Sequence, residues 1–318
     1  GWTWSSGFSD AVHTTLSRQT FAASCVTLMS TNGFDGIDID WEYPVGGGLT
    51  TNKNRPEDKQ NFTFFMAELR RQLVAEGTKQ KRTFLLTITA PSSPSIIDNV
   101  EVSKIHSHVD AMSVMAHSFH GPWAPGLDLT GVSAALYPDP NSLFFEPAKS
   151  SFNVAAAVKR YLDLGVPRHK LHLGLASQGI GFAGVIGSSN GLYGVYTSPA
   201  TGTWGTSYFD YTDLEQNYVG KNGYKRYWHA DARVPWLHNA TAQVMITYED
   251  PRSIREKMWF ARTAGLGGAT IWELSADRNK SLLGVVRADL PRASGLRAPV
   301  RAISAANPGR VDLFVESD

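Results

Sequence analysis

The chain has 318 residues, 42% of them hydrophobic and 19% charged, which is enough to bury one large core. Its 30 basic and 29 acidic residues give a net charge of +1 without a basic run or stripe, so nucleic acid is not expected as a partner. The apolar runs are too short and too often broken by charge to enter a membrane, and the single cysteine excludes an intrachain disulfide and a thiolate metal cluster.

Predicted helices and strands alternate along the chain. The first predicted helix runs from Arg18 to Gly33, with Ser17 as its N-cap and Gly33 as its end. Helical spacing of apolar residues predicts further helices over 55–77, 153–165 and 250–265. Apolar runs with β-branched residues predict strands over 34–41, 84–90, 110–117, 170–177 and 268–274.

The chain has a different composition between the predicted strand 170–177 and the predicted helix 250–265. Between Phe182 and Glu249 the chain is rich in Gly, Tyr, Trp, Asn and Thr in short alternating stretches, which predicts an inserted α+β module. The repeated βα units elsewhere predict a parallel sheet covered by helices, and at this length a (β/α) barrel is the leading architecture. A doubly wound sheet is the alternative, but the sequence lacks the glycine-rich phosphate turn that would favour it.

The stretch FDGIDIDWEYP (34–44) places four acidic residues within eight positions of an otherwise apolar run. In an extended strand Asp38, Asp40 and Glu42 share one face, because alternate residues point the same way. Asp40 and Glu42 would lie about 6.6 Å apart, where two full charges repel by about 2.5 kcal/mol. One of them should therefore keep a proton at neutral pH, as a general acid must. Glu42 is the better donor because it is nearest the C-terminal end of the strand.

The acidic row could instead be structural, or it could hold Mg²⁺ or Ca²⁺. A structural row would need three compensating cations, yet the run contains no Arg or Lys. We therefore predict a proton donor, and we expect neither a metal nor a cofactor.

The acidic pattern D-x-x-D-x-D-x-E, here Asp35, Asp38, Asp40 and Glu42, is followed by Tyr43 and Pro44. It resembles the signature of family 18 glycoside hydrolases, the chitinases, and looks most like the fungal type. The resemblance extends to about residue 283, because GWTWS, FHGPW and GGATIWELSAD resemble the ends of the third, sixth and eighth barrel strands of that family. KNGYKRYW and ITYEDPRSI resemble its insertion module.

The resemblance implies an α/β fold, a (β/α)8 TIM barrel of the family 18 type with an inserted α+β module. The first two βα units would be absent from this chain, which we expect to be a fragment of a longer one; an open barrel, or one completed by another copy, is the alternative. The implied division is 1–182 for the third to seventh βα units, 183–248 for the insertion, 249–290 for the last helix and eighth strand, and 291–318 for a C-terminal tail.

The resemblance also implies a reaction, the substrate-assisted hydrolysis of β-1,4-linked N-acetylglucosamine. Glu42 would protonate the glycosidic oxygen while the acetamido oxygen of the sugar attacks its own anomeric carbon. Asp40 would hydrogen-bond the acetamide nitrogen and then Glu42, and Asp38 would share a proton with Asp40. Aromatic and apolar residues would line the sugar site: Trp272 as its floor, Trp2 and Trp123 stacking on further sugars, and Tyr43 and Met115 beside them. Without that context each tryptophan would be assigned to an ordinary core.

Four polar positions depart from the family pattern. His117 and Ser118 stand where the family has a tyrosine and an aspartate that hold the acetamido group, and Gln178 and Ile180 stand where fungal members have tyrosine and arginine. A neutral serine cannot stabilise a positive intermediate, and losing one such group typically costs about a hundredfold to a thousandfold in rate. His117 could fill the space of the tyrosine, hydrogen-bond the acetamide while neutral, or act as a base. We favour these three roles in that order.

Two functions remain open on this sequence. The first, which we favour, is a secreted binder of chitin or chito-oligosaccharides in which hydrolysis is weakened or lost through His117 and Ser118; the second is a working endochitinase. An endo-N-acetylglucosaminidase acting on glycoprotein glycans is a more distant third. The sequence gives no expectation about the oligomeric state.

Overall fold

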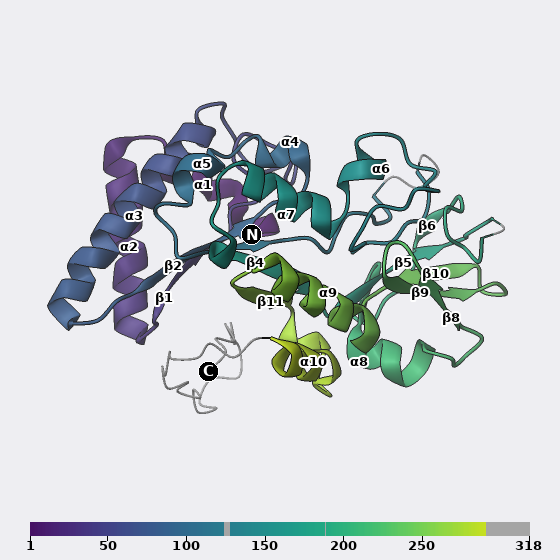
Figure 1. The fold of residues 1–318 in the computed structure, drawn as a ribbon. Helices are drawn as coiled ribbons and strands as arrows, with labels where there is room; N and C mark the ends of the chain where they lie inside the picture. The colour runs from purple at the N-terminus through teal and green to yellow at the C-terminus, as the bar shows by residue number, and fades with distance from the viewer. Residues whose placement is uncertain (124–127, 188, 291–318) are drawn as a thin grey trace. The chain divides into compact units, whose positions relative to one another are not determined.

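The structure is a computed structural model that describes residues 1–123, 128–187 and 189–290 (Figure 1). The chain forms two compact units, and each has its own helices and strands. The first unit comprises Gly1–Ala116 and Ala155–His172, and the second comprises the described residues of 117–154 and 173–290. The predicted tail, 291–318, lies outside the described residues.

The first unit contains three parallel strands, β1 (Gly36–Ile39), β2 (Leu85–Ala90) and β3 (Ala111–Val114). Their register pairs Asp38 with Thr87 and Ile88 with Met112. All four residues of β3 are buried, as expected of a strand covered on both faces. The strands fall within the predicted ranges but are shorter, and β1 ends at Ile39 rather than at Trp41.

Two long helices, α2 (Thr15–Asn32) and α3 (Asp58–Gln80), run side by side in this unit (Figure 1). The predicted N-cap of α2 is wrong, because Thr14 caps the helix and Ser17 forms the third helical position of a capping box. The end at Gly33 is confirmed, since its φ of 69° is a left-handed conformation that glycine adopts freely. The remaining helices of the unit are short: η1 (Trp2–Gly7), α1 (Phe8–Ala11), α4 (Pro94–Ile97), α5 (Val102–Ile105), α7 (Val154–Asp163) and η2 (Arg168–Lys170).

The second unit is built on an antiparallel sheet in the order β6-β5-β10-β9-β8, with β7 also paired to β5. These strands are β5 (Gln178–Ala183), β6 (Ser198–Pro199), β7 (Tyr208–Asp210), β8 (Lys225–His229), β9 (Val234–Asn239) and β10 (Val244–Thr247). The antiparallel sheet therefore begins at Gln178, five residues before the predicted start of the insertion (183 − 178 = 5). The division of the chain into barrel and insertion stays a prediction.

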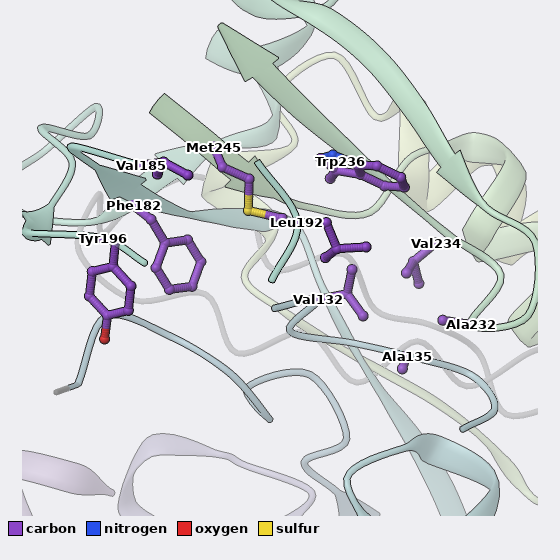
Figure 2. Close-up of a cluster of buried hydrophobic side chains, with 10 residues drawn as sticks. All are labelled: Val132, Ala135, Phe182, Val185, Leu192, Tyr196, Ala232, Val234, Trp236 and Met245. Atoms are coloured by element: carbon purple, nitrogen blue, oxygen red, sulfur yellow. The ribbon is translucent and has the colours of Figure 1, made fainter. Parts of the chain in front are cut away.

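One face of this sheet carries a compact apolar core (Figure 2). Phe182 from β5, Trp236 from β9 and Met245 from β10 contribute large side chains to it. Other members come from the loops, such as Val132 and Leu192. Burial of these side chains fixes the sheet that carries Gln178 and Ile180 at its start.

The rest of the second unit is mainly helical. Helix α9 (Pro251–Ala264) lies within the predicted range 250–265 and is followed by β11 (Gly268–Trp272). Asp250 caps its start and Gly265 ends it. Strand β11 is hydrogen-bonded to β4 (Leu171–Ala176), which begins in the residues of the first unit. The shorter helices are α6 (Ala148–Ser151), α8 (Tyr211–Asp213), η3 (Leu214–Tyr218), η4 (Leu274–Ala276) and α10 (Ser281–Asp289). Among the described residues, none of the helices is both long and apolar enough to span a bilayer.

Candidate active site

The acidic residues lie at the end of β1 in the first unit. Asp38 is on the strand, but Asp40 and Glu42 follow it, because the ladder with β2 ends at the pair Ile39 and Ile88. The expectation of three acids on one strand is therefore wrong in part. Since β1, β2 and β3 are parallel, Met115, directly after β3, lies at the same edge of the sheet as Asp40 and Glu42.

Asp38 is held by the neighbouring strand β2. Thr87 Oγ1 donates a hydrogen bond to Asp38 Oδ1 at 2.5 Å, and Thr89 Oγ1 donates to Asp38 Oδ2 at 3.1 Å. The two threonines share a face of β2 because they are two residues apart. No sequence pattern singles them out, since only the register of β1 and β2 shows that they meet this carboxylate.

Asp40 carries an acceptor without a partner. Among the described residues, its buried Oδ1 atom has no hydrogen-bond partner. A buried carboxylate oxygen is costly unless it is hydrogen-bonded. Asp40 Oδ1 is therefore suited to accept a hydrogen bond from a bound molecule or from a protonated neighbour.

Glu42 has the electrostatics of a proton donor. Burial and, to a smaller extent, the charge of Asp40 together raise its pKa to about 7. The expected repulsion between the two acids is thus present, but desolvation is the larger cause. The backbone N–H of Trp2, 3.1 Å from Oε1, and the hydroxyl of Tyr43 act in the opposite direction and lower the pKa of Glu42. Burial and Glu42 also raise the pKa of Tyr43, whose hydroxyl donates to that carboxyl.

The N-terminal segment encloses these acids. A Cβ atom on residue 1 would lie 2.3 Å from Glu42 Oε1 and 2.4 Å from Asp40 Oδ2, so a larger residue there would displace these carboxyl groups. The buried Ser5 donates to the carbonyl of Gly1 at 2.8 Å and accepts from the backbone N–H of Glu42 at 2.9 Å. Asn52 Nδ2 donates to the carbonyl of Trp2 at 2.9 Å. Sequence reasoning missed Ser5 and Asn52 because they have no charge and lie 37 and 10 residues from Glu42.

The second unit holds the other predicted site residues. Trp272 ends β11, and its carbonyl accepts from the N–H of Ser177 at 2.9 Å, so Trp272 lies beside the start of β5. Gln178 is the first residue of β5 and pairs with Asp210 of β7. Ile180 is buried opposite Thr247 of β10, where an arginine would be costly without a partner.

His117 and Ser118 are neighbours in contact. His117 Nδ1 lies 3.1 Å from Ser118 Oγ. Burial and, to a smaller extent, Lys257 together lower the pKa of His117 to about 4, so the ring is neutral at neutral pH. This favours space filling or neutral hydrogen bonding over action as a base. Ser118 is exposed and uncharged.

Three of the predicted sugar-binding tryptophans are accessible to a ligand. Trp2, Trp123 and Trp272 are exposed by 46%, 56% and 58% respectively. Trp123 packs against Gly121, where a Cβ atom would lie 2.1 Å from the indole ring. By contrast Trp41, in the acidic stretch itself, is buried and stacks on Phe8 with 5.3 Å between the ring centroids. The three exposed rings are therefore not ordinary core residues.

The side chains that could ligate a metal are dispersed over the described parts of the chain. Across 1–123, 128–187 and 189–290, no group of three or more His, Cys, Asp or Glu side chains is arranged to hold a metal ion.

Comparison with known proteins defines the class. The sequence model of glycosyl hydrolases family 18 matches residues 1–277, and the chain belongs to this family. Chitinase A1 of Niallia circulans is 43% identical over 97% of this chain and 44% of its own length. Endochitinase 1 of Metarhizium robertsii is 32% identical over 89% of this chain and 62% of its own length. The expected likeness to the fungal type is therefore wrong, since the bacterial protein is more similar than this fungal one.

A solved structure supports the same fold. Chitinase ChiA74 from Bacillus thuringiensis superposes with a TM-score of 0.86 and 38% identity, covering 91% of this chain and 49% of that one. The chain thus has the α/β fold of family 18 chitinases. It spans about half the length of these two bacterial relatives.

Proposed function

We propose that this chain binds chitin or chito-oligosaccharides, and that hydrolysis is weakened or lost through His117 and Ser118. Family membership supports chitin as the ligand class. The single observation that carries the weakened hydrolysis is the pair His117 and Ser118, one neutral by burial and the other uncharged. We further propose that the protein acts outside the cell, where chitin is found.

The proposed reaction begins at Glu42 in its protonated form. Glu42 gives its proton to the glycosidic oxygen as the bond to the anomeric carbon breaks, and the acetamido oxygen forms a new bond to that carbon. Asp40 Oδ1, without a partner in the described structure, is suited to accept the acetamide N–H. Water then opens the cyclic intermediate and returns a proton to Glu42. The Thr87 and Thr89 contacts would keep Asp38 in place behind Asp40.

The same reaction lacks a negative group where the family has its aspartate. The cyclic intermediate is positively charged, and Ser118 offers it only a hydroxyl dipole. The charged group near His117 is the cation Lys257 rather than an acid. Binding through the exposed faces of Trp2, Trp123 and Trp272, or through Tyr43, Met115 and Gln178, does not depend on this charge. The chain can therefore bind chitin even where it hydrolyses chitin slowly or not at all.

A competent endochitinase is the second candidate. It is favoured by the pKa of about 7 at Glu42, which is the value expected of an active proton donor at neutral pH. Relatives with 43% and 32% identity are named as a chitinase and an endochitinase.

Incubation with chitin hexamer separates the two candidates. We expect calorimetry to show micromolar binding and product analysis to show few or no shorter oligomers. The double variant His117→Tyr with Ser118→Asp should raise turnover by about a hundredfold or more, since it restores one well-placed electrostatic group. Rapid turnover by the unmodified chain would support the endochitinase, and absence of hexamer binding would refute both.

A further inference from the structure

Two buried, uncharged side chains hold the backbone of Glu42 from both sides. Ser5, in η1, is completely buried, and its Oγ accepts from the backbone N–H of Glu42 at 2.9 Å. Asn52 is also buried, and its Nδ2 donates to the carbonyl of Glu42 at 3.3 Å. All three residues belong to the first unit. The predicted proton donor therefore has a partner for each of its two backbone polar groups.

The same two side chains also hold the backbone at Trp2. Ser5 Oγ donates to the carbonyl of Gly1 at 2.8 Å, and Asn52 Nδ2 donates to the carbonyl of Trp2 at 2.9 Å. A hydroxyl can donate and accept at once, and an amide nitrogen carries two donors, so each side chain can make both of its contacts together. These two bridges, formed by Ser5 and Asn52, make up a clasp that joins the segment of Trp2 to Glu42.

The loop that carries Asn52 approaches Glu42 closely. A Cβ atom on Gly48 would lie 2.2 Å from the carbonyl oxygen of Glu42 and 3.1 Å from the backbone nitrogen of Tyr43. Both of these atoms belong to the backbone, which cannot move aside as the end of a flexible side chain can. Loop 45–52 therefore packs directly on the peptide group that follows Glu42, and the lack of a side chain at Gly48 permits this.

The clasp also determines one contact of the acid itself. The backbone N–H of Trp2 donates to Glu42 Oε1 at 3.1 Å. This N–H belongs to the same peptide group as the carbonyl of Gly1, which Ser5 holds. Because a peptide group is planar, a hydrogen bond to its carbonyl also fixes the direction of its N–H. Ser5 thus orients the donor that holds the Glu42 carboxyl.

We propose that Ser5 and Asn52 are positioning residues for the proton donor: they hold Glu42 and Trp2 in one arrangement, so that the carboxyl faces the glycosidic oxygen of a sugar bound at Trp2. Trp2 exposes 46% of its surface and can meet that sugar. Positioning has a large effect, because misplacing a reacting group by about 1 Å can cost about a hundredfold in rate. The role in hydrolysis rests on the proposed function, whereas the hold on the Trp2 N–H does not.

The first test needs no sugar. In the unmodified chain the NMR signal of the Trp2 amide should shift with pH around a midpoint of about 7, because its N–H donates to the Glu42 carboxyl. Glu42→Gln should abolish this shift, which separates it from the titration of Asp40 and Tyr43, the other titratable side chains that act on Glu42. Ser5→Ala should reduce the shift by about twofold or more, because a hydrogen bond weakens steeply when its donor turns away. A Trp2 signal that does not titrate in the unmodified chain would overturn the proposal.

A second variant and a matched control complete this test. Asn52→Ala breaks the other bridge and should also reduce the shift. The control is Ser9→Ala, because Ser9 is equally buried but donates to Asp58 Oδ1 at 2.8 Å rather than contacting Glu42. Ser9→Ala should lose stability and keep the full shift. An unchanged shift in Asn52→Ala and in Ser5→Ala, or in Asn52→Ala alone if Ser5→Ala does not fold, would contradict the clasp, as would an equal loss in the control.

The second test measures hydrolysis of chitin hexamer by the double variant His117→Tyr with Ser118→Asp. Adding Ser5→Ala to it should lower kcat by about tenfold to a hundredfold. KM should change much less, because the substitution leaves the exposed tryptophan rings in the chain. Adding Ser9→Ala should leave kcat as it was. An equal loss of kcat in both would show that packing of the segment, rather than the clasp, sets the rate.

If the double variant neither binds nor hydrolyses hexamer, the proposed function fails, but the titration of the Trp2 amide still decides whether the clasp orients the N–H. If hexamer is hydrolysed and neither Ser5→Ala nor Asn52→Ala changes the titration or the rate, the present inference fails while the proposed function stands.

Discussion

The end of β1 in the first unit and the segment around His117 in the second unit differ in the chemistry of the side chains they carry. Glu42 and Asp40 keep their acidic side chains, and Glu42 has a pKa raised to about 7. His117 and Ser118 are uncharged at neutral pH, and the nearby charge is a cation. On the proposed function, the difference teaches that a chain can carry the group which donates the proton and lack the group which stabilises the resulting positive charge, and such a chain would hydrolyse chitin slowly.

The largest effect is expected for Glu42→Gln made in the double variant that carries His117→Tyr and Ser118→Asp, which is called the restored variant below. Glu42→Gln removes the proton but keeps the shape, and positioned acids contribute about a hundredfold to ten-thousandfold. Turnover of chitin hexamer should fall by that factor while calorimetric affinity changes little. If Glu42→Gln left turnover intact, the first unit would not supply the proton, and the comparison between the two regions would lose its basis.

The second prediction concerns pH. Because Glu42 must be protonated to act, and its pKa is raised to about 7, hydrolysis by the restored double variant should be constant below that pH. Above it the rate should fall about tenfold for each pH unit, since the protonated fraction falls by that factor. The pH profile of kcat/KM measures this. A rate that already falls from about pH 4.5 upward would mean that Glu42 has an ordinary pKa.

Asp40→Asn should change both the rate and the pH profile. The amide cannot take up the acetamide N–H as a carboxylate does, so the rate of the restored variant should drop by about a hundredfold. Loss of the negative neighbour also lowers the pKa of Glu42, so the descending limb should move to lower pH by about one. Asp38→Asn is the matched control, because Asp38 is bound by Thr87 and Thr89. Asp38→Asn should move the descending limb of the pH profile less than Asp40→Asn does. An equal shift would show that the acidic residues titrate as one unit.

The sequence predicted the acidic site better than its surroundings. Alternation predicted one strand face for Asp38, Asp40 and Glu42, of which only Asp38 lies on β1. Charge repulsion predicted a raised pKa at Glu42, which is confirmed, although burial is the larger cause. Ser5 and Asn52 could not be found, because their contacts depend on how the N-terminal segment folds over the acids rather than on a local pattern.

Lys257 is different, because a signal for it existed. The buried residues of α9 include Ile254, Lys257, Met258 and Ala261, whose spacing is that of one helical face. A lysine within such an apolar face indicates a buried cation that needs a partner. That partner, Glu249, is eight residues earlier and outside the helix, so periodicity alone could not have identified it.

The smallest effect is expected for a substitution of Tyr43, which tests how the first unit sets the pKa of Glu42. Its hydroxyl donates to the Glu42 carboxyl and so favours the ionised form. Tyr43→Phe should therefore raise the pKa of Glu42 and move the descending limb of the restored variant to higher pH by about 0.5. The matched control is Tyr161→Phe, which removes a buried hydroxyl that donates to the carbonyl of Pro91 at 2.7 Å. That control should lower the melting temperature but leave the limb in place. A limb that moved equally in both variants would mean that loss of packing, rather than the hydrogen bond to Glu42, sets the pH at which the proton is lost.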